Sequence, residues 1–141
     1  MAKMPVYVVM SHLATAAGIN LSEVNSGKTT THYGANHWAY EMGGKTYGGP
    51  VDCSGLIYAI GRKVDSTLEY HTSSWYGINA AGDISTVPEE HGIYLWKDGH
   101  VAIYTGNGYT IEAIDTATGC GRRGNRLGAF TKWGRLGWVQ Y

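Results

Sequence analysis

The chain has 141 residues, the size of one compact domain with a core of its own. Apolar residues make up 43% of it and charged residues only 16%, a balance that excludes a disordered chain. Acidic and basic side chains cancel, so no overall field draws the protein to nucleic acid, and no apolar run reaches the roughly 18 residues of a membrane-spanning helix. We therefore expect a single monomeric domain over residues 1–141 that binds neither nucleic acid nor membrane.

The first elements in the chain are a helix and a long loop. Residues 5–17 predict a helix, because Pro5 suits a first turn and Gly18 a C-terminal cap. The apolar run 6–10 faintly imitates a signal peptide, but Ser11 and His12 interrupt it, so we interpret it as part of the domain. On this interpretation the protein is made in the cytoplasm without a signal peptide. Residues 20–49, rich in Gly, Thr and Asn, predict a long loop.

The remaining elements predict helices first and strands afterwards. Two further helices are expected over residues 53–63 and 72–76. Beyond Pro88 the pattern becomes β-rich, with strands expected over residues 92–96, 100–105, 109–114 and 137–141. This order predicts an α+β fold with a mainly antiparallel sheet.

The segment Asp52-Cys53-Ser54-Gly55 lies where the loop runs into the predicted second helix. The positive end of a helix stabilises a thiolate, and its free N–H groups can hold an oxyanion. A buried cysteine can also be a small apolar residue, so Cys53 by itself does not decide between the two. Without an export signal we expect Cys53 and Cys120 to be free thiols and not a disulfide.

His100 begins a predicted strand, and Glu112 lies in the next one, beyond a glycine-rich turn. A three-residue loop (106–108) would set Thr105 opposite Tyr109, and His100 and Glu112 would then share one face of the sheet as diagonal neighbours. A two-residue loop would put them on opposite faces. On one face, the carboxylate would hold the second N–H of an imidazole that acts on Cys53, which predicts a catalytic triad.

Three runs carry a resemblance to a known family: GGPVDCSGLIYAI, GHVAIYTGNGYTIEA and KWGRLGWVQY. They resemble the NlpC-type peptidoglycan endopeptidases, the cell-wall branch of the papain-like cysteine peptidases. The family pattern of Tyr-x-x-Gly-Gly, Asp-Cys-Ser-Gly and Gly-His-Val-(Gly/Ala)-Ile-Tyr-x-Gly-(Asn/Asp)-Gly is matched at residues 40–44, 52–55 and 99–108. The resemblance covers residues 40–141, the expected catalytic core. Residues 1–39, the helix and loop, have the general look of the N-terminal portion of phage lysins.

The resemblance implies a role for each matched position. Cys53 would be the nucleophile and His100 the base, and Glu112 would take the third position, which in the family is more often His, Asn or Gln. Tyr40 would point its hydroxyl toward the nucleophile and aid the oxyanion or the substrate. Two flanking residues would contact substrate or shape the start of the helix: Asp52 and Ser54.

The implied activity is hydrolysis of a stem-peptide amide bond of peptidoglycan, commonly the one between D-γ-glutamate and the diamino acid, without a cofactor. A bacteriolytic phage endolysin, an injected toxin and a domain cut from a larger lysin all fit. The alternatives are an N-acetylmuramoyl-L-alanine amidase of CHAP-like type, an acyltransferase, and a non-catalytic wall-binding module. His32 and His37 lie five residues apart in a glycine-rich loop, a weak metal pattern, so we expect no metal site.

Two sets of residues leave structural and functional interpretations open. A basic cluster is expected to be a solvated loop, with contact to an anionic polymer or to substrate carboxylates as the alternative: Arg122, Arg123, Arg126, Lys132 and Arg135. Four aromatic residues are candidate walls of a substrate groove, or simply core: Trp38, Tyr47, Trp75 and Trp96.

Overall fold

The structure is a computed structural model that describes residues 3–24 and 31–141. Its helices are α1 (Val6–Ala17), α2 (Leu21–Val24), α3 (Cys53–Gly61) and α4 (Ser73–Ile78), with 3-10 turns η1 (Ile84–Thr86) and η2 (Leu127–Ala129). Its strands are β1 (Met4–Pro5), β2 (Gly82–Asp83), β3 (Tyr94–Lys97), β4 (His100–Gly106), β5 (Tyr109–Ala113), β6 (Cys120–Arg123), β7 (Lys132–Gly134) and β8 (Val139–Gln140).

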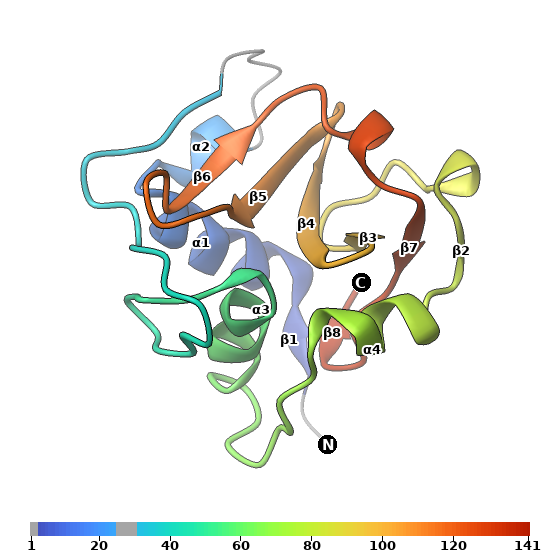
Figure 1. Ribbon diagram of the computed structural model, residues 1–141, viewed down its shortest axis with the longest axis horizontal. Coiled ribbons are helices and arrows are strands. Elements are labelled where there is room, and N and C mark those ends of the chain that lie inside the picture. The colour runs from blue at the N-terminus through green and yellow to red at the C-terminus, as the bar shows by residue number, and fades with distance from the viewer. Residues whose placement is uncertain (1–2, 25–30) are drawn as a thin grey trace.

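Six strands form one antiparallel sheet in the order β2-β7-β3-β4-β5-β6. Helices α1 and α3 lie together beside β4, β5 and β6, and α4 packs on β3 (Figure 1). The predicted α+β class with a mainly antiparallel sheet is confirmed. Among the described residues, no helix is long and apolar enough to cross a bilayer.

Helix α1 forms where the sequence predicts it. Its buried side chains, Val9, Met10 and Leu13 among them, face the core, and Gly18 ends the helix in the left-handed conformation at φ 71°. The N–H of Gly18 donates to the carbonyls of the preceding turn, which satisfies groups that the helix itself leaves free. The predicted loop over residues 20–49 contains one short helix, α2, and its residues 25–30 lie outside the described part.

The β4–β5 hairpin differs from the prediction at its tip. Gly106 pairs with Tyr109, so the loop has two residues and the expected pairing of Thr105 with Tyr109 is wrong. A bulge at Thr105 absorbs the extra residue, and beyond it Tyr104 pairs with Thr110 and Ile103 with Ile111. The register along the strands is therefore the one that a three-residue loop would give.

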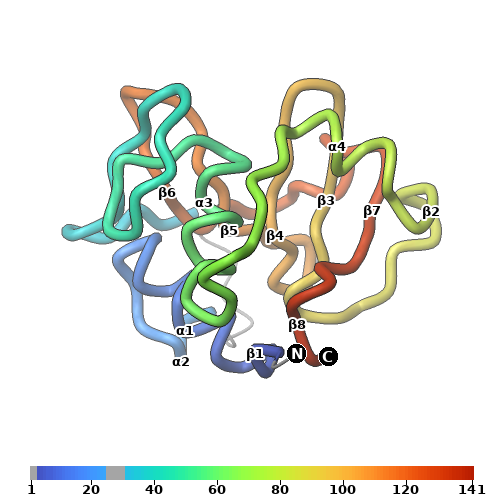
Figure 2. The backbone as a smooth tube through the Cα atoms, turned by 90° about the horizontal axis from the view of Figure 1, so that it is seen from below, coloured from blue at the N-terminus to red at the C-terminus, as the bar shows by residue number. Residues whose placement is uncertain are grey.

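The predicted closing strand is shorter than expected and lies outside the main sheet. Val139 and Gln140 pair in parallel with Met4 and Pro5, so β1 and β8 form a separate ribbon. The first and last strands consequently lie side by side (Figure 2). The prediction did not include β2, β6 and β7, which complete the sheet on either side of the β3–β4–β5 meander.

Apolar side chains cover both faces of the sheet. The larger core lies between the sheet and the helices and includes Leu13, Leu56 and Ile111. The smaller one holds Leu95, Tyr104 and other buried residues against the segments around η1 and η2. Strand β4 is therefore fixed from both sides, and this makes its first residue, His100, a rigid position from which to hold an imidazole.

Candidate active site

Cys53 is the first residue of α3, as the sequence predicts, and its side chain is half-buried. Asp52 caps this helix: its Oδ1 accepts the Gly55 N–H at 2.7 Å, and its Oδ2 accepts the Gly43 N–H at 2.8 Å. The free N–H groups and the positive end of α3 thus meet at the thiol. These N–H groups offer donors to an oxyanion that forms beside the thiol.

Two glycine-containing motifs interlock at the start of α3. The Asp52 N–H donates to the Gly44 carbonyl at 3.0 Å, and this carbonyl lies so close to α3 that a Cβ on Gly55 would be 1.8 Å from its oxygen. Tyr40 lies in the same segment and bridges to Val51, two residues before the nucleophile. The glycines therefore let the segment 40–51 pack directly on the helix that carries Cys53.

His100 lies between Cys53 and Glu112. Its Nε2 is 2.7 Å from Glu112 Oε1, and its side chain is 15% exposed. Burial by itself lowers the pKa of this imidazole, but hydrogen bonds with the Cys53 thiol and with Glu112, together with the charge of both groups, raise that pKa to about 9. Because Glu112 takes Nε2, Nδ1 is the nitrogen that remains for the thiol.

Glu112 is fully buried and surrounded by donors. Arg126 binds it with two bonds, Nε to Oε2 at 2.7 Å and Nη2 to Oε1 at 2.9 Å, and the Thr110 hydroxyl donates to Oε2. Burial raises the pKa of this carboxyl, but the hydrogen bonds from His100, Arg126 and Thr110 outweigh burial and lower it to about 2. The carboxylate therefore stays charged and holds the imidazole in its protonated form.

A profile of one protein family matches residues 37–126, more than half of the chain and the part that holds the whole Cys53–His100–Glu112 set. The chain belongs to the NlpC/P60 family. Members of this family are cysteine peptidases of the cell wall that act on peptidoglycan, and the resemblance inferred from the motifs is confirmed. A search of curated protein sequences returned no match.

The three other expected site residues of the NlpC/P60 domain surround the nucleophile differently. Burial raises the pKa of the Tyr40 hydroxyl, and the nearby charges of Cys53 and Asp52 raise it further, which places Tyr40 beside the site. Ser54 is buried, and its hydroxyl lies 2.7 Å from that of Tyr70. Of the two roles left open for Asp52 and Ser54, these contacts favour shaping the start of the helix.

The basic cluster of the NlpC/P60 domain is solvated only in part, so that expectation is wrong for Arg122 and Arg126. Arg122 is 1% exposed and lies over the ring of Tyr109 at 3.8 Å, and Arg126 binds Glu112 inside the site. Lys132 and Arg135 are exposed, and Arg135 binds Glu90 at 2.8 Å. A charge count gives the number of cations but does not show which segments the fold returns to the interior.

The histidines of the glycine-rich loop have structural partners. His32 pairs with Glu23 at 2.7 Å, and His37 lies 3.0 Å from the Cys120 carbonyl. In the described part of the chain, no three His, Cys, Asp or Glu side chains gather into a group that could hold a metal ion. These contacts account for both imidazoles without a ligand.

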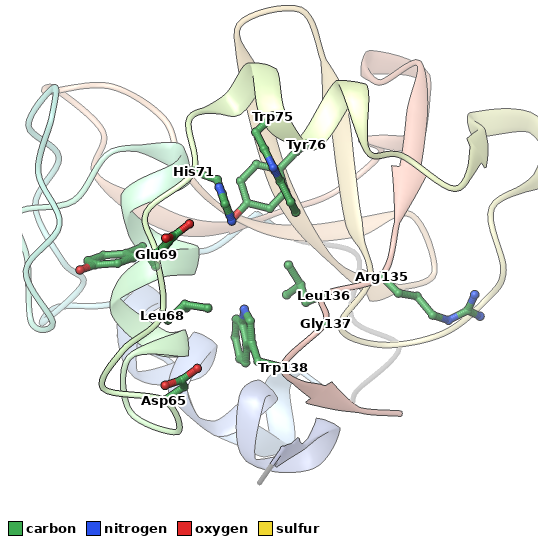
Figure 3. Close-up of a pocket in the computed structure, with 11 residues that line it drawn as sticks. Asp65, Leu68, Glu69, His71, Trp75, Tyr76, Arg135, Leu136, Gly137 and Trp138 are labelled. Carbon is green, nitrogen blue, oxygen red and sulfur yellow. The ribbon is translucent and has the colours of Figure 1, made fainter. Parts of the chain in front are cut away.

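A cavity of about 250 Å³ lies beside α3, between Tyr58 on the helix, Tyr76 on α4 and Trp138 near the C-terminus (Figure 3). Trp75, which is 39% exposed and stacks on His71, forms its outer wall. Of the four aromatic residues considered as groove walls, Trp75 is the one that lines this cavity. The other three belong to packed regions: Trp38, Tyr47 and Trp96.

Proposed function

We propose that this NlpC/P60 protein hydrolyses an amide bond in the stem peptide of peptidoglycan, with Cys53 as the nucleophile. The observation that carries this proposal is the continuous set of contacts from the Cys53 thiol through His100 to the buried Glu112 carboxylate. A protein that only binds cell wall has no use for a thiol held against a charged imidazole. The family match supports peptidoglycan as the substrate.

The geometry supports a thioester mechanism. With its pKa near 9, His100 carries a proton at neutral pH, and Cys53 can supply that proton and remain as the thiolate. The thiolate attacks the amide carbonyl, and the Cys53 N–H and the Tyr40 hydroxyl hold the resulting oxyanion. His100 then gives its proton to the leaving amine, which breaks the C–N bond and leaves an acyl thioester.

The second half of the reaction releases the acyl group. Neutral His100 takes a proton from water, and the hydroxide attacks the thioester carbonyl. The C–S bond breaks, the thiolate of Cys53 is restored beside protonated His100, and the carboxylic acid product loses its proton to solvent as it leaves. Glu112 keeps the imidazole in one orientation through both halves, because Nε2 stays bound to Oε1.

We propose the bond between D-γ-glutamate and the diamino acid as the one that is cut, and a bacteriolytic role as a phage endolysin or an injected effector that reaches the wall after release. The match of residues 40–44, 52–55 and 99–108 to the motifs of the family supports cleavage within the stem peptide. Lysis of whole bacteria by the purified protein added from outside tests the bacteriolytic role, and intact cells beside digested purified walls would contradict it.

Digestion of purified peptidoglycan of known stem type, followed by product masses, tests the reaction. The wild type should release fragments with a free amine on the diamino acid, and Cys53→Ala should release none. Cys120→Ala is the matched control, since it makes the same change at a buried cysteine outside the site and should keep activity. A free lactoyl group instead would assign an amidase. Equal lysis by wild type and Cys53→Ala, or binding without products, would overturn the proposal.

A further inference from the structure

Glu112 is a buried negative charge that Cys53 and His100 do not neutralise by themselves. A buried carboxylate is costly unless its charge is paired and its oxygens are hydrogen-bonded. In this site four donors converge on its two oxygens: one from His100, two from Arg126 and one from Thr110. Arg126 supplies half of them and the only permanent positive charge among them, since guanidinium does not lose its proton in proteins.

The fold holds Arg126 in place from two sides. Its backbone N–H donates to the Gly108 carbonyl at the tip of the β4–β5 hairpin, at 2.8 Å. Its guanidinium lies 5.3 Å from the ring centre of Phe130, and the Phe130 ring stacks 5.9 Å from the imidazole of His100 at an angle of 23°. The turn η2 separates Arg126 from Phe130, so one short segment contacts both the carboxylate and the base.

We propose that Arg126 is a positioning residue of this site, which lets a carboxylate serve in the third position by neutralising its charge and binding both of its oxygens. With a neutral third residue, the thiolate and the imidazolium already balance. With Glu112, the site gains a negative charge, and Arg126 restores the balance. The groups around the imidazole are then Cys53 on α3, Glu112 on β5 and Arg126 before η2, with the Tyr33 hydroxyl near the last two.

This role predicts a reversal between single and double variants. Glu112→Gln leaves the Arg126 cation without its counterion on the side of the imidazole away from Cys53. The cation disfavours transfer of the thiol proton to His100, and the thiolate–imidazolium pair becomes less populated. Removing that cation as well, in Glu112→Gln/Arg126→Gln, returns the site to a neutral third position. The double variant should consequently have a more reactive Cys53 than the Glu112→Gln variant, although it carries one more substitution.

The test is the rate at which iodoacetamide alkylates Cys53 from roughly pH 4 to 10, in a Cys120→Ala background. At pH 7 we expect Glu112→Gln to react about tenfold or more slowly than the parent, and the double variant to recover most of that loss. Arg126→Gln alone should move both limbs of the curve of rate against pH, the one at which the thiolate forms and the one at which the imidazolium loses its proton, to higher pH. Arg126→Lys keeps the positive charge but loses the two-donor guanidinium geometry, so it should keep the limbs at the same pH and lower the maximum alkylation rate between them.

Arg135→Gln is the matched control, because it breaks another Arg–carboxylate pair, at the surface and remote from the triad, and should leave the curve unchanged. Urea unfolding shows which variants are folded at each pH. If Glu112→Gln does not fold, the comparison of Arg126→Gln with Arg126→Lys decides. A folded double variant as slow as Glu112→Gln, or a folded Arg126→Gln curve that superposes on the parent, would overturn the proposal.

The proposal rests on the proposed function only in that Cys53 and His100 form the reactive pair. Alkylation needs no peptidoglycan, so its outcome is separate from that of the digestion experiment. A wrong substrate would leave the alkylation curves as expected. A wrong role for Arg126 would change these curves and leave the identity of the cleaved bond untouched.

Discussion

Replacing Gly55 by Ala tests whether the two interlocked motifs set the position of the nucleophile. The new Cβ would lie 1.8 Å from the Gly44 oxygen and 2.8 Å from Asp52 Oδ1. Ala is a better helix former than Gly by about 1 kcal/mol, so without a clash the change would stabilise α3. Loss of the Asp52 cap offsets that gain at about 1 kcal/mol. Overpacking against a backbone carbonyl costs about a further 1–3 kcal/mol, so the net change in the free energy of unfolding is a loss.

The net loss of about 1–3 kcal/mol should lower the midpoint of thermal unfolding by roughly 3–10 °C, followed by circular dichroism. Alkylation of Cys53 should also slow, because the segment 40–51 and the start of α3 must separate. Gly137→Ala is the control: nothing lies within 4 Å of its Cβ and its backbone is outside the left-handed region, so it should be neutral or slightly stabilising. A Gly55→Ala protein at least as stable as the wild type would refute the reasoning.

Two further predictions concern titration. The pKa of His100 is near 9 in the folded protein against 6.5 in the unfolded chain, so its contribution to stability is complete below about pH 6.5 and is lost as the pH rises through 9. The pKa of Glu112 is lowered from 4.5 to about 2, so its contribution to stability is lost as the pH falls through 2. The free energy of unfolding of the wild type, measured in urea, should fall between pH 6.5 and 9 by at most about 3 kcal/mol. The same fall in a His100→Gln variant would contradict this. Burial raises the pKa of the Cys120 thiol to about 12, so a thiol reagent should label one cysteine, Cys53, in the folded chain and two in urea; labelling of both without urea would show that Cys120 is accessible.

The sequence predicts the parts of this site that local chemistry determines. Asp52 at a helix start and His100 at a strand start are recognisable because each belongs to one element and its cap. The approach of Glu112 to His100 follows from strand pairing, which depends on a single hairpin. That step gave the correct face even though the loop has two residues, because the bulge at Thr105 restored the register.

The contacts that the sequence does not predict come from chain segments that return over a distance. Arg126 lies 14 residues beyond Glu112, after the end of β6, and no local pattern distinguishes it from the solvent-exposed Arg135. The three-residue strand β7 is too short to show a period of its own, and it forms because β2 and β3 flank it. Such contacts depend on where the chain comes back, which composition and periodicity do not encode.

The burial of the second cysteine decides how this site would respond to oxidants. In the proposed mechanism Cys53 reacts as a thiolate, which is the form that peroxides convert to sulfenic acid, and a nearby second thiol commonly rescues such a residue as a disulfide. Cys120, fully buried in β6 and protonated at every ordinary pH, cannot act as that resolving partner. Recovery of an oxidised Cys53 therefore depends on a thiol from outside the molecule, and without one the damage proceeds to the irreversible sulfinic acid.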